Sequence, residues 1–279
     1  MNETDTATRR FAVMGHPIAH SKSPWIHARF AEQFGLQMDY TAIDVMPGTF
    51  IQAARTFQKL GGKGLNITVP YKLEAWELVD QRSARAELAG AVNTIRFEED
   101  GSLYGDNSDG QGLLNDLLGN LGITLARQRL LLLGAGGAVR GVLGPLLGQQ
   151  PAECVIANRT IARAEDLAQL FAGLGDIEPC GFAELAGRRF DVVINGTAAS
   201  LAGEVPPLPE ELFRPGALAY DMMYADRPTA FMQWARQHGA ERVCDGLGML
   251  VEQAAESFFI WWDKRPETGP VIAVLREAA

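Results

Sequence analysis

The sequence predicts an α/β protein built from two domains. Strand-like and helix-like patterns alternate between Phe11 and Gly110, and a second alternation begins at Leu130. Such alternation indicates mainly parallel sheets covered by helices. The chain has 279 residues, of which 47% are hydrophobic and 21% charged, so it is long enough and apolar enough for two cores in a globular protein.

The first alternation predicts three strands, three helices and a hairpin. The expected strands are Phe11–Met14, Tyr40–Val45 and Leu65–Val69, and the expected helices are Pro24–Phe34, Thr49–Leu60 and Leu73–Val79. Val92–Phe97 and Ser102–Tyr104 flank a four-residue turn ending in Gly101, which is typical of a hairpin. Asp109–Leu121 is expected to be a helix that connects the two domains, with Asp109 as its N-cap.

The second alternation predicts a nucleotide-binding type of sheet wound with helices. Its expected strands are Leu130–Leu133, Cys154–Ala157, Ile177–Cys180, Asp191–Ile194, Ala217–Asp221 and Arg242–Cys244. Two further helices, Met249–Trp262 and Val271–Glu277, fall outside this alternation and are expected to pack on the first domain. We therefore expect a discontinuous domain, 1–108 with 247–279, and an inserted domain, 109–246, with a ligand-binding cleft between them.

The most specific signal lies where the apolar run Leu130–Leu133 meets a glycine-rich turn. The turn consists of Gly134, Ala135, Gly136 and Gly137, and the helix expected over Ala138–Leu147 follows it. Glycines remove side chains where backbone N–H groups at a helix N-terminus would hold a pyrophosphate. Val139 stands at the third glycine position of the G-x-G-x-x-G pattern, so the spacing departs from the usual one. For the glycines alone, a simple tight turn is the alternative interpretation.

The loop after the next strand identifies the expected cofactor. It reads Asn158-Arg159-Thr160, with Arg163 one helical turn later. Enzymes that use NAD usually place an acidic residue here, on the ribose 2′-hydroxyl. Arginines instead offer planar donor groups to a 2′-phosphate, which a carboxylate would repel. Together, the glycine turn and the arginine loop predict that the chain binds NADP.

Composition limits the remaining classes of function. A net charge of −9 argues against broad nucleic-acid binding. No apolar run approaches the ~20 residues of a membrane helix, and the polar start resembles no signal peptide, so we expect a cytoplasmic protein without a membrane partner. Three isolated cysteines and four histidines lack metal-ligand spacing, so no metal site is expected.

Four loops that border strands in the first domain carry polar side chains suited to a small polyhydroxylated ligand. The loops are Gly15–Pro24, Asn66–Lys72, Ala89–Thr94 and Gly105–Gly110. With the Gly134 turn, the Asn158–Thr160 loop and the segment Asp245–Gln253, they resemble the shikimate dehydrogenase family over nearly the whole chain and in the family's order. The departures are Val139, the segment Asn195–Ser200 where the family usually has Asn-Ala-Thr-Ser-x-Gly, and a ten-residue N-terminal lead.

The resemblance implies reversible reduction of 3-dehydroshikimate to shikimate by NADPH, a step toward chorismate and the aromatic amino acids. It assigns Lys72 and Asp106 as the catalytic pair that handles the proton of the reacting hydroxyl. It also implies a set of binding residues. Ser21, Ser23 and Tyr224 would hold the substrate carboxylate, Thr68, Asn93 and Gln253 the ring hydroxyls, and Thr197, Gly246 and Met249 would border the cofactor.

Two other functions remain open on the sequence. A quinate/shikimate dehydrogenase that uses NAD would share the fold, although Arg159 and Arg163 argue against it. A non-catalytic NADP-sensing protein would keep the phosphate turn and lose the proton-transfer pair. Taken singly, Ser21, Ser23, Asn93 and Gln253 could be capping, turn or helix-surface residues, and Lys72 could be a solvated surface lysine. A homodimer is a further expectation that the sequence leaves open.

Overall fold

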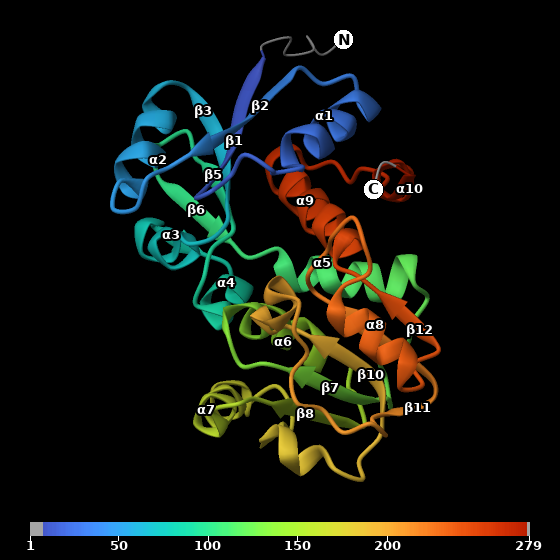
Figure 1. Ribbon diagram of the computed structural model, residues 1–279. Helices are drawn as coiled ribbons and strands as arrows, with labels where there is room; N and C mark the ends of the chain where they lie inside the picture. Colours follow the sequence, from blue (N-terminus) through green and yellow to red (C-terminus); the bar gives the residue numbers. More distant parts are fainter. Residues whose placement is uncertain (1–7, 278–279) are drawn as a thin grey trace. The chain divides into compact units, whose positions relative to one another are not determined.

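The computed structural model describes residues 8–277 and contains two six-stranded sheets (Figure 1). The chain divides into two compact units. Unit 1 comprises the residues up to Gly112 together with Val251–Val274, and unit 2 comprises Leu113–Leu250 with the end of the chain from Leu275. The α/β class predicted from the alternating pattern is confirmed. The unit boundaries fall four residues after the predicted domain boundaries at 108 and 246.

The sheet of unit 1 is mixed. Its strands are β1 (Arg9–Gly15), β2 (Met38–Asp44), β3 (Gly62–Ile67), β4 (Gln81–Arg82), β5 (Thr94–Phe97) and β6 (Leu103–Asp106), in the spatial order β2-β1-β3-β5-β6-β4. β1 pairs in parallel with both β2 and β3, whereas β5 is antiparallel to β3 and β6. The chain therefore winds to both sides of β1, and the predicted hairpin forms β5 and β6.

Helices and aromatic residues cover this sheet. The helices of unit 1 are α1 (Ser23–Gln33), α2 (Phe50–Lys59), α3 (Lys72–Leu78), α4 (Ala84–Ala89) and α5 (Asp109–Asn115), and α9 (Leu247–Trp262) and α10 (Gly269–Glu277) lie mostly in it. One core cluster contains Phe50 and Tyr71, whose rings stack at 5.2 Å. A second contains Phe11 and Trp261, and the Trp261 Nε1 donates to the carbonyl of Ile95 at 3.0 Å.

The sheet of unit 2 is entirely parallel. Its strands are β7 (Arg129–Leu133), β8 (Glu153–Ala157), β9 (Glu178–Cys180), β10 (Phe190–Asn195), β11 (Phe213–Asp221) and β12 (Arg242–Cys244), in the order β12-β11-β10-β7-β8-β9. Counted from β7, this is the order 3-2-1-4-5-6 of a Rossmann-type fold, with its switch point between β7 and β10. Residues Leu130–Leu133 are fully buried, as expected for a central parallel strand.

Helices α6 (Gly137–Leu147), α7 (Ile161–Phe171) and α8 (Ala230–Gln237) belong to unit 2, with short 3₁₀ turns at Phe182–Leu185 and Ala198–Ala202. All six predicted strands of this unit are present. In contrast, the helix predicted over Asp109–Leu121 consists of α5 and a π-helical turn, Asp116–Asn120. The strand β4 and the helix α4 were not predicted.

His27 supplies an uncharged ring to the interior of unit 1. The side chain is fully buried on α1 and stacks on Tyr40, with ring centroids 4.3 Å apart and planes at 11°. Burial lowers the pKa of His27 from 6.5 to about 3. The residue therefore remains neutral in the folded chain at pH values where it is protonated in the unfolded chain.

We predict that His27 makes stability fall at acid pH. Below about pH 6.5 the unfolded chain binds a proton at His27 that the folded chain does not bind until about pH 3, so stability is lost as the pH falls through this window. In His27→Phe this loss is absent. The unfolding free energy of the variant minus that of wild type should therefore increase by about 1.4 kcal/mol for each unit by which the pH is lowered, well below pH 6.5. Urea denaturation at several pH values measures the difference, with the exposed His20→Asn as control. A difference independent of pH contradicts the prediction.

Candidate active site

Four loops meet at one edge of the unit 1 sheet because of its mixed topology. The carboxyl ends of β1 and β3 lie at this edge, as the pairing of Met14 with Ile67 shows. β5 runs the opposite way, so its first residue, Thr94, lies at the same edge and pairs with Asp106 at the end of β6. Open α/β sheets bind ligands beyond the carboxyl ends of strands, on either side of the strand where the winding reverses.

The central interaction at this edge is an ion pair between Lys72 and Asp109. Lys72 begins α3 and Asp109 begins α5, and the Nζ lies 2.5 Å from an Oδ2 of the carboxylate. The other carboxylate oxygen accepts a hydrogen bond from the Nδ2 of Asn93 at 2.8 Å. Both charged side chains remain partly exposed, Lys72 by 29% and Asp109 by 18%, so a ligand can reach the ammonium group.

The expected pairing of Lys72 with Asp106 is corrected by this geometry. Asp106 is only 4% exposed and forms an ion pair with Arg85, which donates from Nε at 2.6 Å and from Nη2 at 2.9 Å. The hydroxyl of Ser83 and the backbone N–H of Asn107 also donate to Asp106. Two carboxylates three residues apart thus have different partners, because β6 ends at Asp106 and the chain turns before Asp109.

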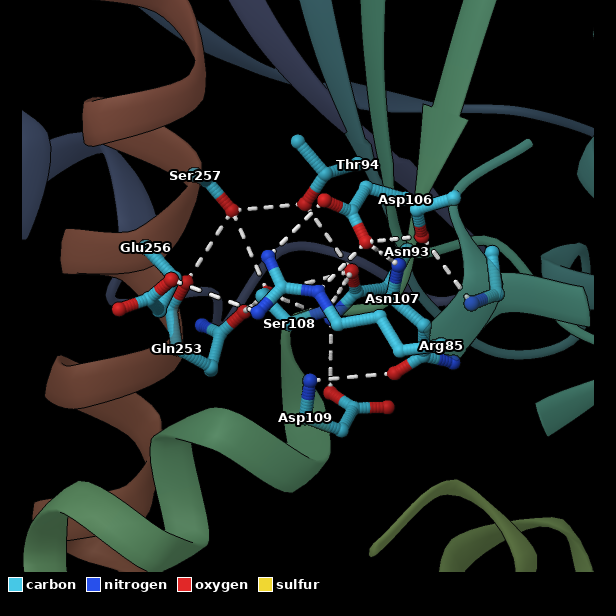
Figure 2. A network of polar contacts seen from close by, with 12 residues as sticks. Arg85, Asn93, Thr94, Asp106, Asn107, Ser108, Asp109, Gln253, Glu256 and Ser257 are labelled. Carbon is cyan, nitrogen blue, oxygen red and sulfur yellow. Dashed lines mark hydrogen bonds and ion pairs between the residues drawn. The ribbon is translucent and has the colours of Figure 1, made fainter. Parts of the chain in front are cut away.

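Arg85 links Asp106 to a second buried carboxylate. Its Nη1 lies 3.4 Å from an oxygen of Glu256 on α9, and Arg265 donates to the other oxygen at 2.5 Å. The four side chains carry two positive and two negative charges, and Figure 2 shows Arg85 between Asp106 and Glu256. Sequence analysis did not identify this arrangement, because Arg85 lies 21 residues from Asp106 and 171 residues from Glu256.

Asn93 fixes the orientation of Asp109. It is 2% exposed; its Nδ2 donates to both Asp109 and the hydroxyl of Ser108, and its Oδ1 accepts from the backbone N–H of Ser108. The hydroxyl of Ser108 also donates to the Oε1 of Gln253 on α9 at 3.4 Å. Figure 2 shows this network between the loop before α5 and the face of α9. The structure thus brings Asn93 and Gln253 to the same network as Asp109.

A close contact between two helices places Gln253. A Cβ on Gly112 of α5 would lie 2.6 Å from the backbone nitrogen of Gln253. Only glycine allows α5 and α9 to approach this closely without a shift of backbone. Sequence analysis did not identify Gly112 as important for the site, because the contact joins residues far apart in the chain.

The remaining residues expected to bind substrate in unit 1 lie on the loops after β1 and β3. Ser21 is partly exposed, and its hydroxyl accepts a hydrogen bond from the backbone N–H of Ser23, a residue that is 8% exposed. Thr68 is tied to the β1 strand through its N–H, which donates to the carbonyl of Met14 at 3.0 Å. Their polar side chains therefore belong to the same sheet edge as Lys72.

In unit 2, the glycine turn has the shape expected of a phosphate cradle. Gly134 has a φ of +101°, which favours glycine, and a Cβ on Gly136 or Gly137 would meet no atom within 4 Å. α6 begins at Gly137 and its N-cap, Gly136, offers no side-chain hydrogen bond. The first N–H groups of α6 and the open space above the glycines fit a pyrophosphate. Ala135 lies between the glycines of the turn, and Ala138, in the first turn of α6, is exposed.

The basic loop follows β8, the strand next to β7. Arg159, Thr160 and Arg163 are exposed. The side chain of Asn158 donates to the carbonyl of Thr160 at 2.8 Å, which shapes the loop at the start of α7. This position beside the glycine turn and the exposure of both guanidinium groups fit the 2′-phosphate of NADP.

The other predicted residues of unit 2 lie after β10, β11 and β12. Thr197 donates through its hydroxyl to the Oδ1 of Asn195 at 2.7 Å. A Cβ on Gly246 would lie 2.2 Å from the carbonyl oxygen of Met222, so this glycine is required for space. Met249 is 9% exposed on α9, and Tyr224 is half-buried, which raises the pKa of its hydroxyl.

Comparison with known proteins identifies the family. Family models match residues 13–95 as a shikimate dehydrogenase substrate binding domain, 117–202 as shikimate / quinate 5-dehydrogenase, and 246–276 as a shikimate 5′-dehydrogenase C-terminal domain. A shikimate dehydrogenase (NADP(+)) from Alkalilimnicola ehrlichii is 60% identical over 269 residues, which cover 96% of this chain and 99% of that protein. The chain belongs to the shikimate dehydrogenase family.

Solved structures of similar proteins support the fold assignment of this family member. An Ael1 enzyme from Pseudomonas putida has a TM-score of 0.92 and 47% identity, over 96% of this chain and 98% of that chain. Shikimate 5-dehydrogenase from Thermus thermophilus, solved with NADP(H) and shikimate, has a TM-score of 0.85 and 34% identity, over 97% and 100%. The resemblance and fold predicted from the sequence are therefore confirmed.

Two features are absent from residues 8–277, the part of the chain that the structure describes. Among these residues, no cluster of three or more histidine, cysteine and acidic side chains is arranged to hold a metal ion. Within the same range, no helix has both the length and the apolar character needed to cross a bilayer.

We predict that Asp106 supports folding through its pair with Arg85. In Asp106→Asn the partly buried guanidinium of Arg85 loses its main negative partner, so the free energy of unfolding should fall by about 2 kcal/mol. This is less than for a fully buried pair, because Arg85 is partly exposed and keeps Glu256. Urea denaturation measures the change. The exposed Glu99→Gln serves as control and should stay within about 0.5 kcal/mol of wild type. Wild-type stability of Asp106→Asn would contradict this role.

Proposed function

We propose that the chain catalyses the reversible NADPH-dependent reduction of 3-dehydroshikimate to shikimate in the biosynthesis of chorismate and aromatic amino acids. The observation that carries the proposal is the Lys72–Asp109 pair, partly exposed among amide and hydroxyl side chains at a ligand-binding edge. The names of the relatives support the cofactor and the substrate, since they are NADP(+)-dependent shikimate dehydrogenases. The arginine loop beside the glycine turn supports NADP independently.

We assign proton transfer to Lys72, with Asp109 rather than Asp106 as its partner. When bound, NADPH supplies the hydride to the ring carbonyl carbon. The Lys72 ammonium stabilises the negative charge that develops on the carbonyl oxygen and donates a proton to it. Asp109 holds the ammonium in place. The Asp109 carboxylate in turn accepts a hydrogen bond from the side chain of Asn93, which fixes the orientation of the carboxylate. In the oxidation direction, Lys72 accepts the proton from the substrate hydroxyl, so it must be neutral at the start of that step.

We assign the other polar residues to binding. Ser21 and Ser23, with Tyr224, hold the substrate carboxylate, and Thr68, Asn93 and Gln253 bind the ring hydroxyls. Hydroxyls and amides suit this role because each ligand group removed from water needs a partner. Asn93 already donates to Asp109, so it can couple a bound hydroxyl to the catalytic carboxylate.

We assign the cofactor to unit 2. Residues Gly134–Ala138 hold the pyrophosphate, Asn158, Arg159, Thr160 and Arg163 hold the adenosine end, and Thr197, Gly246 and Met249 border the nicotinamide end. The uncapped start of α6 and the exposure of Arg159 and Arg163 support the first two assignments. We further propose a cytoplasmic enzyme without nucleic-acid or membrane partners, and a homodimer as the oligomeric state to test by sedimentation.

Two alternatives make different predictions. A quinate/shikimate dehydrogenase would turn over quinate with NAD, and the matching family model covers both ring acids. A non-catalytic NADP-sensing protein would bind NADPH without turnover, although the retained Lys72–Asp109 pair favours an enzyme. Steady-state rates of each cofactor with each ring acid separate the three functions.

We predict that Lys72→Ala lowers kcat by a factor of about 10² to 10⁴ with little change in the affinity for shikimate, because a general acid and base is lost. Asp109→Asn should also lower kcat, and by more than Asp106→Asn does once rates are corrected for folded protein. Initial rates of NADPH formation from shikimate and NADP measure kcat. A larger loss in Asp106→Asn than in Asp109→Asn would restore Asp106 as the catalytic carboxylate.

We predict that Arg159→Ala weakens NADPH binding by about 10- to 100-fold and NADH binding much less, because only NADPH has a 2′-phosphate for the charged hydrogen bond. Fluorescence titration of the purified variant with each nucleotide gives both dissociation constants. Equal weakening of the two nucleotides would indicate a general defect of unit 2 instead of a lost phosphate contact.

A further inference from the structure

The two departures from the family pattern in unit 2 contact each other. Val139 stands in the first turn of α6, where the dinucleotide pattern has its third glycine, and is fully buried. Gly196 directly follows β10. A Cβ on Gly196 would lie 2.5 Å from the Cγ2 of Val139 and 3.2 Å from the sulfur of Met222. The third glycine of the pattern usually provides space between helix and sheet. Here Val139 fills that position on the helix, and Gly196, at the end of β10, provides the space from the sheet.

The need for glycine at position 196 is steric. Its φ lies outside the left-handed region, so an L-residue can adopt the backbone conformation. The clash with Val139 cannot be relieved easily, because valine in a helix has one strongly preferred rotamer. A distance of 2.5 Å between carbon atoms is far inside van der Waals contact, so either the helix or the strand end must move.

The end of β10 is not free to move away. The N–H of Gly196 donates to the carbonyl of Leu133 at 2.9 Å, which joins it to the last residue of β7. The side chain of Asn195 accepts from both the N–H and the hydroxyl of Thr197, and donates to the buried Asp221 at 3.2 Å. The segment Asn195–Thr197 is thus anchored on both sides, and a displacement caused by a larger residue would fall on α6.

The start of α6 is the phosphate turn itself. Gly134 also packs against this segment, since its Cβ would lie 3.2 Å from the Cγ2 of Thr197 and 3.3 Å from the carbonyl carbon of Gly196. We infer that Gly196 acts as the missing third glycine of the dinucleotide turn, and that the space it leaves for Val139 lets the N-terminus of α6 lie where it can hold the cofactor pyrophosphate. Gly196 is a positioning residue by this inference, which rests on the assignment of the pyrophosphate to Gly134–Ala138.

Paired variants test the inference through cofactor binding. Gly196→Ala should raise the dissociation constant of NADPH by tenfold or more, whereas Val139→Ala alone should change it by less than threefold. The double variant Val139→Ala/Gly196→Ala should return to within threefold of Val139→Ala, because the smaller side chain makes room for the new methyl group. A double variant that binds as weakly as Gly196→Ala overturns the inference.

A second ligand separates positioning of the turn from general damage. Adenosine 2′-monophosphate carries the 2′-phosphate and lacks the pyrophosphate, so Gly196→Ala should change its dissociation constant by less than threefold. Equal weakening of both ligands overturns the inference. If Gly196→Ala does not fold, a folded double variant that binds NADPH supports the pairing and an unfolded one overturns it. Failure of the wild-type protein to bind NADPH would instead refute the cofactor assignment.

Discussion

The site in unit 1 depends on keeping one carboxylate available beside Lys72. Asp106 ends β6 and Asp109 begins α5, on either side of a two-residue connection, and an ammonium group could pair with either of them. Arg85, Ser83 and the N–H of Asn107 occupy the oxygens of Asp106, so this carboxylate is engaged inside the protein. Asp109 then remains for Lys72, and Asn93 sets its orientation. Each of the two carboxylates therefore pairs with its own cation, Asp106 with Arg85 and Asp109 with Lys72.

Neutralisation of the buried charges explains why this pairing is stable. Asp106 and Glu256 are both nearly buried, and an unpaired carboxylate in such a place would cost several kcal/mol. Arg85 contacts both, and Arg265 completes the balance from a more exposed position. The Lys72–Asp109 pair is more exposed than Asp106, so its contribution to stability is small. Because the Lys72 side chain is partly exposed, its ammonium group can exchange the Asp109 carboxylate for an oxygen atom of a ligand.

The sequence predicted the fold and most residues that gather at the two candidate sites, because those depend on local patterns. Alternation gave the strands, and the glycine turn with Arg159 gave the cofactor. The failures have two causes, elements that are too short and contacts between residues far apart in the chain. β4 and α4 are too short for periodicity to indicate them. The π turn at Asp116 forms where this buried carboxylate accepts from Tyr220, a residue more than a hundred positions away. The choice between Asp106 and Asp109 likewise depended on Arg85, which no spacing rule connects to either.

Close packing of backbone is a second constraint that local patterns do not reveal. Gly112 allows α5 to reach the backbone of α9, and Gly248 faces the carboxylate of Asp116, where a Cβ would lie 2.0 Å from an oxygen. Neither glycine has a left-handed φ, so their conformations alone would allow other residues. Each instead brings two elements together beside a residue expected to bind a ligand, Gln253 or Met249. In the same way, a dinucleotide turn that lacks its third glycine can keep the close packing of helix on sheet, since either partner in the contact can contribute the required space.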